Sequence, residues 1–362
     1  MATNTIIPFK ATHPGTLIKD ELEVRKDITQ KDLATLFGVK ASFLNEIIKG
    51  KRPVTADIAI LLEKAFGISA DYWMKFQSQY EIDIARIKDK NINKIKLIEI
   101  WNIITHYVPI KYFNKMGYLT DDISKNISII QAIYSVQSID GLVNKFSERK
   151  FAFFKKSEKL QIDEKKIIAW ISLVEYKAER KETNTFNFEN LPQLNKELQE
   201  IFYKNKNVLD LVDKKLAQYG VKFLLVDKLE KTPIDGYSFW SKNNPAIALT
   251  LRNNRIDNVA FTLLHELGHI AIHLKNNKDI KFIDLTKIEE NEIENEANIY
   301  AQESLIPPDC WNDLLENYNT VNDESIAVFS NKYRINPAIV LGRACFEMNY
   351  YGLKTNIDKK LY

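Results

Sequence analysis

The feature that most constrains this chain is a pair of histidines inside the apolar segment at residues 261–270, FTLLHELGHI. Residues four apart project from the same face of an α-helix, so His265 and His269 can bind one metal ion at about 2.0–2.1 Å. Glu266 lies beside that face, where its carboxylate can take a proton from a zinc-bound water of pKa about 7. This HExxH pattern predicts a zinc site with two histidine ligands and Glu266 as the catalytic base.

A chance pair of histidines on a buried helix is the alternative. The surrounding positions are apolar, and Gly268 lies between the two histidines. A glycine leaves room for a neighbouring element to approach the metal, so the context favours a metal site. His273 lies about 12 Å along the helix axis from His265, which is too far for both to bind one zinc ion. We expect His273 to stack on a ligand or to hydrogen-bond to one.

The third ligand must come from another segment, and an acidic run extends from Glu289 to Glu296. One helical stripe in this region contains Glu294, Ala297, Asn298, Ala301 and Leu305. Glu294 therefore shares a face with side chains that should pack inward, whereas Glu296 lies on a more solvated face. We predict Glu294 as the third ligand, with Glu290 as the alternative and Asn298 as a hydrogen-bond donor that supports the ligands.

Helix and strand signals divide the chain into four zones. In order, these are short helices, longer lysine-rich helices, strand-like runs with the metal helix, and further helices. Their bounds are residues 1–80, 82–205, 206–310 and 311–362. In the third zone, the β-prone runs 221–226 and 246–251 flank the turn-rich segment 231–236. The predicted fold is α+β and predominantly helical: a helix-turn-helix bundle, a helical middle region, a small sheet with the HExxH helix, and a helical C-terminus.

The N-terminal zone carries helix-turn-helix signals. Thr29 can cap a helix that Gly38 ends, and the next helix would turn Leu44 and Ile47 inward. Residues 38–53 hold four basic side chains and one acidic side chain, a local charge of +3 that attracts phosphates. We predict DNA contacts by Gln30, Lys40, Ser42, Asn45, Lys49, Lys51 and Arg52.

Composition excludes several classes of protein. No window approaches the about 18 apolar residues of a membrane span, and the start of the chain lacks a secretion-signal pattern. Cys310 and Cys345 cannot form a disulfide framework and do not have CxxC spacing. We therefore expect a cytoplasmic protein without a membrane partner. The net charge is only +3, from 51 basic and 48 acidic residues, so binding to nucleic acid depends on local charge.

Residues 261–269, together with 294–301 (ENEANIYA) and 305–307 (LIP), resemble the ImmA/IrrE family of zinc metallopeptidases. The resemblance implies a gluzincin-like fold around the small sheet. It implies that zinc is held by His265, His269 and Glu294 and that Glu266 is the catalytic acidic residue. Known members regulate stress, phage or mobile-element genes by acting on helix-turn-helix repressors, so the resemblance implies that substrate class.

Residues 28–34 (ITQKDLA) and 45–53 (NEIIKGKRP) resemble XRE/HigA-type antitoxin domains. Such domains often have Arg-Gln at the head of the recognition helix, where this chain has residues 40–43, KASF. Fewer side chains are then available for bidentate contacts with bases. A scaffold that binds a toxin protein is therefore the alternative to DNA binding, and a homodimer is compatible with both.

Together these patterns predict a zinc endopeptidase with a DNA-binding regulatory domain that cleaves a helix-turn-helix repressor or antitoxin. The strand at 246–251 would pair with an extended substrate. Tyr237 and Arg252 are candidates for stabilising the oxyanion, although Arg252 could equally be structural. The alternative function is a non-enzymatic transcriptional repressor or antitoxin in which zinc has a structural or sensing role.

Overall fold

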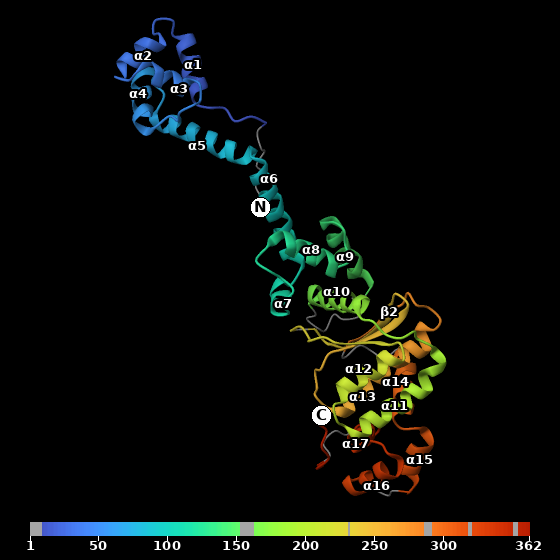
Figure 1. Ribbon diagram of the computed structural model, residues 1–362. Helices are drawn as coiled ribbons and strands as arrows, with labels where there is room; N and C mark the ends of the chain where they lie inside the picture. Colours follow the sequence, from blue (N-terminus) through green and yellow to red (C-terminus); the bar gives the residue numbers. More distant parts are fainter. Residues whose placement is uncertain (1–8, 153–162, 231, 286–291, 318–320, 350–353) are drawn as a thin grey trace. The chain divides into compact units, whose positions relative to one another are not determined.

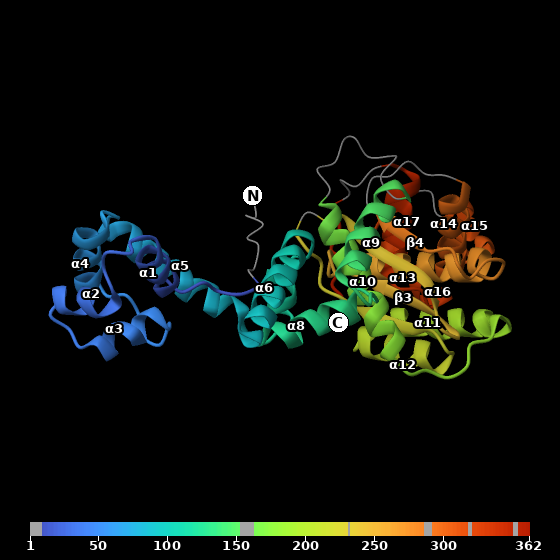
Figure 2. The ribbon, with the colours of Figure 1, turned by 90° about the horizontal axis from the view of Figure 1, so that it is seen from above.

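The computed structural model describes residues 9–152, 163–230, 232–285, 292–317, 321–349 and 354–362 (Figures 1 and 2). The chain divides into two compact units, Met1–Asn102 and Ile103–Tyr362. Helices dominate the described residues, and a four-stranded sheet lies in the second unit. The predicted α+β, predominantly helical fold is thereby confirmed. The finer division into four zones stays a prediction.

The first unit is a helical bundle. Its helices are α1 (Gly15–Val24), α2 (Gln30–Leu36), α3 (Ala41–Ile48), α4 (Ala56–Phe66), α5 (Ala70–Ile87) and the first part of α6 (Asp89–Tyr107). The Thr29 hydroxyl accepts a hydrogen bond from the Asp32 backbone N–H, and the Asp32 carboxylate accepts one from the Thr29 backbone N–H. This capping box starts α2. Fully buried Leu33, Leu44 and Ile47 hold α2 and α3 together as the predicted helix-turn-helix.

The second unit contains the sheet and the remaining helices. Before the sheet lie α7 (Ile110–Lys115), α8 (Ile123–Ile133), α9 (Ile139–Ala152), α10 (Glu164–Arg180), the short 3-10 helix η1 (Phe188–Asn190), α11 (Leu191–Lys204) and α12 (Val208–Gln218). Among and after the strands lie α13 (Ile256–Gly268), the π-helix η2 (His269–Leu274), α14 (Glu292–Leu305), α15 (Pro308–Asn317), α16 (Asp323–Tyr333) and α17 (Pro337–Glu347). No described helix is both long and apolar enough to cross a membrane.

The sheet lies between helical layers. Its strands are β1 (Lys222–Leu225), β2 (Ile234–Ser241), β3 (Asn244–Leu249) and β4 (Phe282–Leu285), in the order β1-β3-β2-β4. β1 and β3 are parallel, and the other neighbouring pairs are antiparallel. Figure 1 shows α10 on one face of the sheet and α12, α13 and α14 on the other, and Figure 2 looks down through α10 onto β3 and α13. β3 is buried at every position because strands flank it and helices cover it.

Two expectations about this sheet are wrong. The turn-rich segment 231–236 was expected to separate the strands, but Ile234–Gly236 are the first residues of β2. Ile234 is fully buried there, and long-range packing overrides the local turn preference. The second error concerns the strand expected to pair with substrate. β3 has β1 on one side and β2 on the other, so it offers no free edge.

Candidate metal centre

The structure brings the imidazoles of His265 and His269 together with the carboxylate of Glu294. Their ligand atoms all lie within 4.8 Å of one another. His265 Nε2 is 3.2 Å and His269 Nε2 is 3.6 Å from Glu294 Oε2, and the two nitrogens are 3.1 Å apart. Both histidines are buried, whereas Glu294 is partly exposed. Solvent therefore reaches the group from the side of Glu294.

Close packing of α13 against α14 brings the three groups together. A Cβ placed on Gly268 would lie 3.2 Å from the Cα of Ala297, which is closer than ordinary contact. The glycine thus lets α14 approach the metal helix, as predicted. Ala297 is fully buried at this contact and shares the inward face of α14 with Glu294 and Asn298.

The protonation states of these groups suit a metal ion. His265 Nδ1 lies 2.9 Å from Asn298 Oδ1. Because an amide oxygen only accepts, His265 Nδ1 carries the proton, and Asn298 is the acceptor of this bond and not the donor that was predicted. His265 Nε2 then presents its lone pair to Glu294. Burial lowers the pKa of His269, which favours its neutral ring.

Two imidazole nitrogens and an ionised carboxylate therefore point toward a common position. Without a cation, three lone-pair-bearing atoms this close together would repel one another. Two histidines with one glutamate are the protein ligands of many catalytic zinc sites, which keep the fourth position open. The three residues thus fit a catalytic Zn²⁺ site better than a structural Zn²⁺ site, because a structural site has four protein ligands.

His273 and Glu296 extend the group beyond its ligands. His273 Nδ1 lies 3.1 Å from His269 Nδ1, and His273 Nε2 lies 2.9 Å from Glu296 Oε2. The carboxylate accepts from His273 Nε2–H, so His273 Nδ1 accepts from His269 Nδ1–H. His269 Nε2 is then free of its proton and faces Glu294. The Phe282 ring stacks on His269 with centroids 4.3 Å apart, which further fixes the imidazole plane.

We expect Glu296→Ala and His273→Ala to lower zinc affinity by about 10- to 100-fold each, because each change removes the chain of hydrogen bonds that orients His269. Competition with a zinc-binding dye measures the affinity. Glu303→Ala is a matched control, since Glu303 is exposed on the same helix. If Glu296→Ala and His273→Ala bind zinc as tightly as the Glu303→Ala control, His273 and Glu296 do not support the site.

The structure places Glu266 on the face of α13 that meets β2, where its side chain is fully buried. Tyr237 of β2 points to the opposite face of the sheet. Its hydroxyl donates to Glu175 Oε1 at 2.8 Å, and its ring packs against Trp170. Tyr237 is therefore not placed to stabilise an oxyanion beside α13, because successive strand residues point to opposite faces. Arg252 donates to Asp235 Oδ1 at 3.1 Å, in line with the structural alternative. The alternative ligand Glu290 lies outside the described residues.

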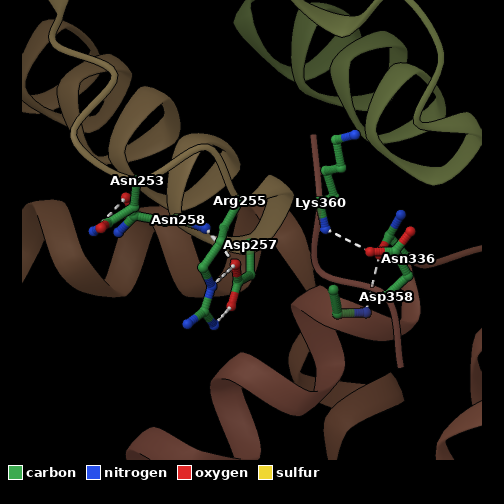
Figure 3. Close-up of polar contacts among 8 residues, drawn as sticks. Asn253, Arg255, Asp257, Asn258, Asn336, Asp358 and Lys360 are labelled. Atoms are coloured by element: carbon green, nitrogen blue, oxygen red, sulfur yellow. Dashed lines mark hydrogen bonds and ion pairs between the residues drawn. The ribbon is translucent and has the colours of Figure 1, made fainter. Parts of the chain in front are cut away.

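A cavity of about 440 Å³ adjoins the metal centre. Phe261 and Asn298 line it, and both also contact His265. Arg255 and Asp257 form an ion pair at the start of α13, on the wall of this cavity (Figure 3). The C-terminal residues run alongside: Ile256 N–H donates to the Lys359 carbonyl at 2.9 Å. Sequence patterns did not reveal this cavity because its wall combines segments that are distant in the chain.

The predicted DNA-contacting residues surround α3. Gln30 is the first residue of α2, and Lys40 directly precedes α3. Ser42 and Asn45 lie on α3, and Lys49, Lys51 and Arg52 follow it. All except half-buried Gln30 and Asn45 are exposed. Arg52 forms an ion pair with Glu46, and its guanidinium lies 5.3 Å from the centre of the Phe43 ring. Among the described residues, no acidic side chain forms an ion pair with Lys40, Lys49 or Lys51 on this surface.

Comparison with known proteins identifies two family matches. Residues 18–73 match the model of the helix-turn-helix family, and residues 218–338 match the M78 peptidase model described as the IrrE N-terminal-like domain. The second match contains all three potential ligands.

Individual relatives cover parts of the chain. Virulence-associated protein I of Dichelobacter nodosus is 33% identical over 85 residues, which are 24% of this chain and 79% of the relative. Metallopeptidase ImmA of Bacillus subtilis is 27% identical over 79 residues, 22% of this chain and 46% of ImmA. A solved HigA-family addiction module antidote protein from Coxiella burnetii is 31% identical, with a TM-score of 0.23 over 24% of this chain and 95% of that protein.

Proposed function

Because the chain belongs to the helix-turn-helix family at residues 18–73 and to the IrrE N-terminal-like family at residues 218–338, we propose that it is a zinc endopeptidase of the cytoplasm with a DNA-binding domain. The convergence of His265, His269 and Glu294 is the observation that carries the proposal. The proposed substrate is a helix-turn-helix repressor or antitoxin, the class that the ImmA/IrrE resemblance implies. The similarity to an ImmA that is named a metallopeptidase supports the activity.

Each residue of the centre has a role in this proposal. His265, His269 and Glu294 would hold zinc, and the ion would supply a Lewis acid that activates water and polarises a peptide carbonyl. Asn298 fixes the proton of His265 on Nδ1, and His273 does the same for His269. Glu266, adjacent to His265, would accept the proton of the attacking water as general base. The cavity beside Phe261 gives substrate side chains a place to bind near the reacting carbonyl.

A proteome-derived peptide library tests the peptidase activity without a known substrate. The zinc-loaded protein should generate new peptide N-termini, detected by mass spectrometry, and 1,10-phenanthroline should abolish them. A helix-turn-helix repressor or antitoxin encoded beside the gene should then be cut at a defined bond. If the folded, zinc-loaded protein cleaves neither the library nor such a repressor, the endopeptidase proposal fails.

DNA binding by the first unit is the second part of the proposal. Its support is the helix-turn-helix family match and the exposed cations Lys40, Lys49 and Lys51 around α3. Each lysine that contacts a phosphate releases counterions, so affinity should fall as salt rises. We expect Lys51→Ala to reduce the slope of log affinity against log salt by about 0.9 on a duplex probe. Lys75→Ala, an exposed lysine on α5, is the control.

The salt titration also addresses the alternative, a protein-binding antitoxin scaffold without DNA binding. Pairing of Arg52 with Glu46 favours that alternative, since it neutralises one of the predicted phosphate-binding cations. Complete absence of DNA binding at low salt by folded protein, with copurification of a small toxin, would favour the scaffold.

A further inference from the structure

A strand glycine, Gly236, lies directly against the buried carboxylate of Glu266. A Cβ placed on Gly236 would lie 2.1 Å from Glu266 Oε1, 2.7 Å from Cδ and 2.8 Å from Cγ. Side-chain carbons do not approach other atoms this closely, so any residue other than glycine would displace the Glu266 side chain or separate α13 from β2.

The surrounding sheet leaves little freedom for such a displacement. Gly236 pairs with Leu249 of β3 on one side and with Asp284 of β4 on the other. Its backbone is therefore held on both sides. The register between β2 and β4 shifts between Ile234 and Gly236, and such irregularities redirect side chains near functional sites. Glu266 is fully buried, so its carboxylate cannot swing into solvent without opening the interface between helix and sheet.

Glycine is otherwise a poor choice at this position. In a strand interior it adds backbone entropy to the unfolded chain and contributes no side-chain packing. The φ angle of Gly236 is not in the left-handed region, so backbone conformation does not require a glycine. What requires it is the space taken by the Glu266 carboxylate.

We propose that Gly236 is a positioning residue for Glu266: the missing side chain creates the space that holds the carboxylate in its working orientation. The inference rests on the proposed role of Glu266 as general base. It adds a residue in a separate strand, 30 positions before Glu266, on which that role depends. In this proposal Gly236 acts only through the Glu266 side chain.

The test is Gly236→Ala, with Gly141→Ala as the control. A Cβ on Gly141 meets only ordinary contacts of 3.5 Å or more. Displacement of a catalytic group by about 1 Å costs about 100-fold in rate. We therefore expect kcat on a cleaved library peptide to fall about 100-fold in Gly236→Ala, with KM and zinc content unchanged. In a Glu266→Gln background, Gly236→Ala should cause no comparable further loss of kcat.

Thermal unfolding tests the same contact without any activity. Gly236→Ala should lower the Tm of the full chain by about 5 °C through overpacking. Glu266→Ala removes all three atoms that the new Cβ would meet, so in that background the same change should lower Tm far less. If the single variant fails to fold, the Gly236→Ala/Glu266→Ala double variant should fold.

Equal Tm losses in the two backgrounds, or an unchanged kcat in Gly236→Ala, would overturn the proposal. Absence of peptidase activity in the wild-type protein would refute the proposed function instead. The Tm comparison would still decide whether Gly236 makes room for Glu266.

Discussion

Replacing Glu266 by glutamine should leave zinc bound and lower the rate of peptide cleavage by about 100- to 10,000-fold. The amide has nearly the same shape as the carboxylate but cannot accept a proton from water, and a positioned general base contributes about this factor. Glu266 is fully buried beside β2, so the isosteric change should preserve the packing of α13. Zinc content by atomic emission and kcat on one cleaved peptide are the two measurements.

Glu303→Gln is the matched control, because Glu303 is exposed on α14 and should leave both values unchanged. The outcome also separates the two functions considered above. A protein that uses zinc only for structure or sensing would retain its function in Glu266→Gln. Full cleavage activity in that variant would remove Glu266 from the mechanism.

Replacing a ligand should have the second large effect, which is loss of zinc itself. His265→Ala and Glu294→Ala each remove one of three converging groups. We expect zinc to fall well below one ion per chain after dialysis against a weak chelator. The loss of affinity should exceed the about 10- to 100-fold expected for removal of an outer hydrogen-bond partner such as His273. Cleavage should disappear together with the metal.

Folding of the variants needs its own control, because His265 is buried and its removal leaves a cavity. Circular dichroism and Tm should show that the helices persist. Leu264→Ala creates a cavity at the neighbouring, fully buried position without removing a ligand, so it should lose stability but keep zinc. Retention of full zinc stoichiometry in both His265→Ala and Glu294→Ala would refute the proposed site.

Local periodicity predicted which side chains converge at the candidate metal centre. The spacing of His265 and His269 places both on one helical face, and the inward stripe of α14 predicts that Glu294 and Asn298 face the metal helix. The structure brings all four side chains together. The helix-turn-helix could be predicted in the same way, because its cap, its glycine turn and its buried residues are neighbours in the chain.

Features that depend on contacts between distant segments could not be predicted from local sequence patterns. The order of the strands decides that β3 is central, and no local pattern encodes the partners of a strand. Glu296 was assigned to a solvated face, which is correct for its exposure but omits its hydrogen bond to His273. Gly236 lies in the segment 231–236 that was interpreted as turn-rich, where glycine is common, so only the structure reveals its close approach to Glu266.

The π-helix at His269–Leu274 imposes a length constraint on this part of the chain. Its wider turn contains an i→i+5 backbone pattern, and such turns behave as an α-helix with one residue added. Deleting one residue between His269 and His273 would return this segment to α-helical spacing and move the His273 ring relative to the His269 ring. The 3.1 Å contact between the Nδ1 atoms of the two rings would then be lost. Such a deletion should therefore lower zinc affinity about as much as His273→Ala does.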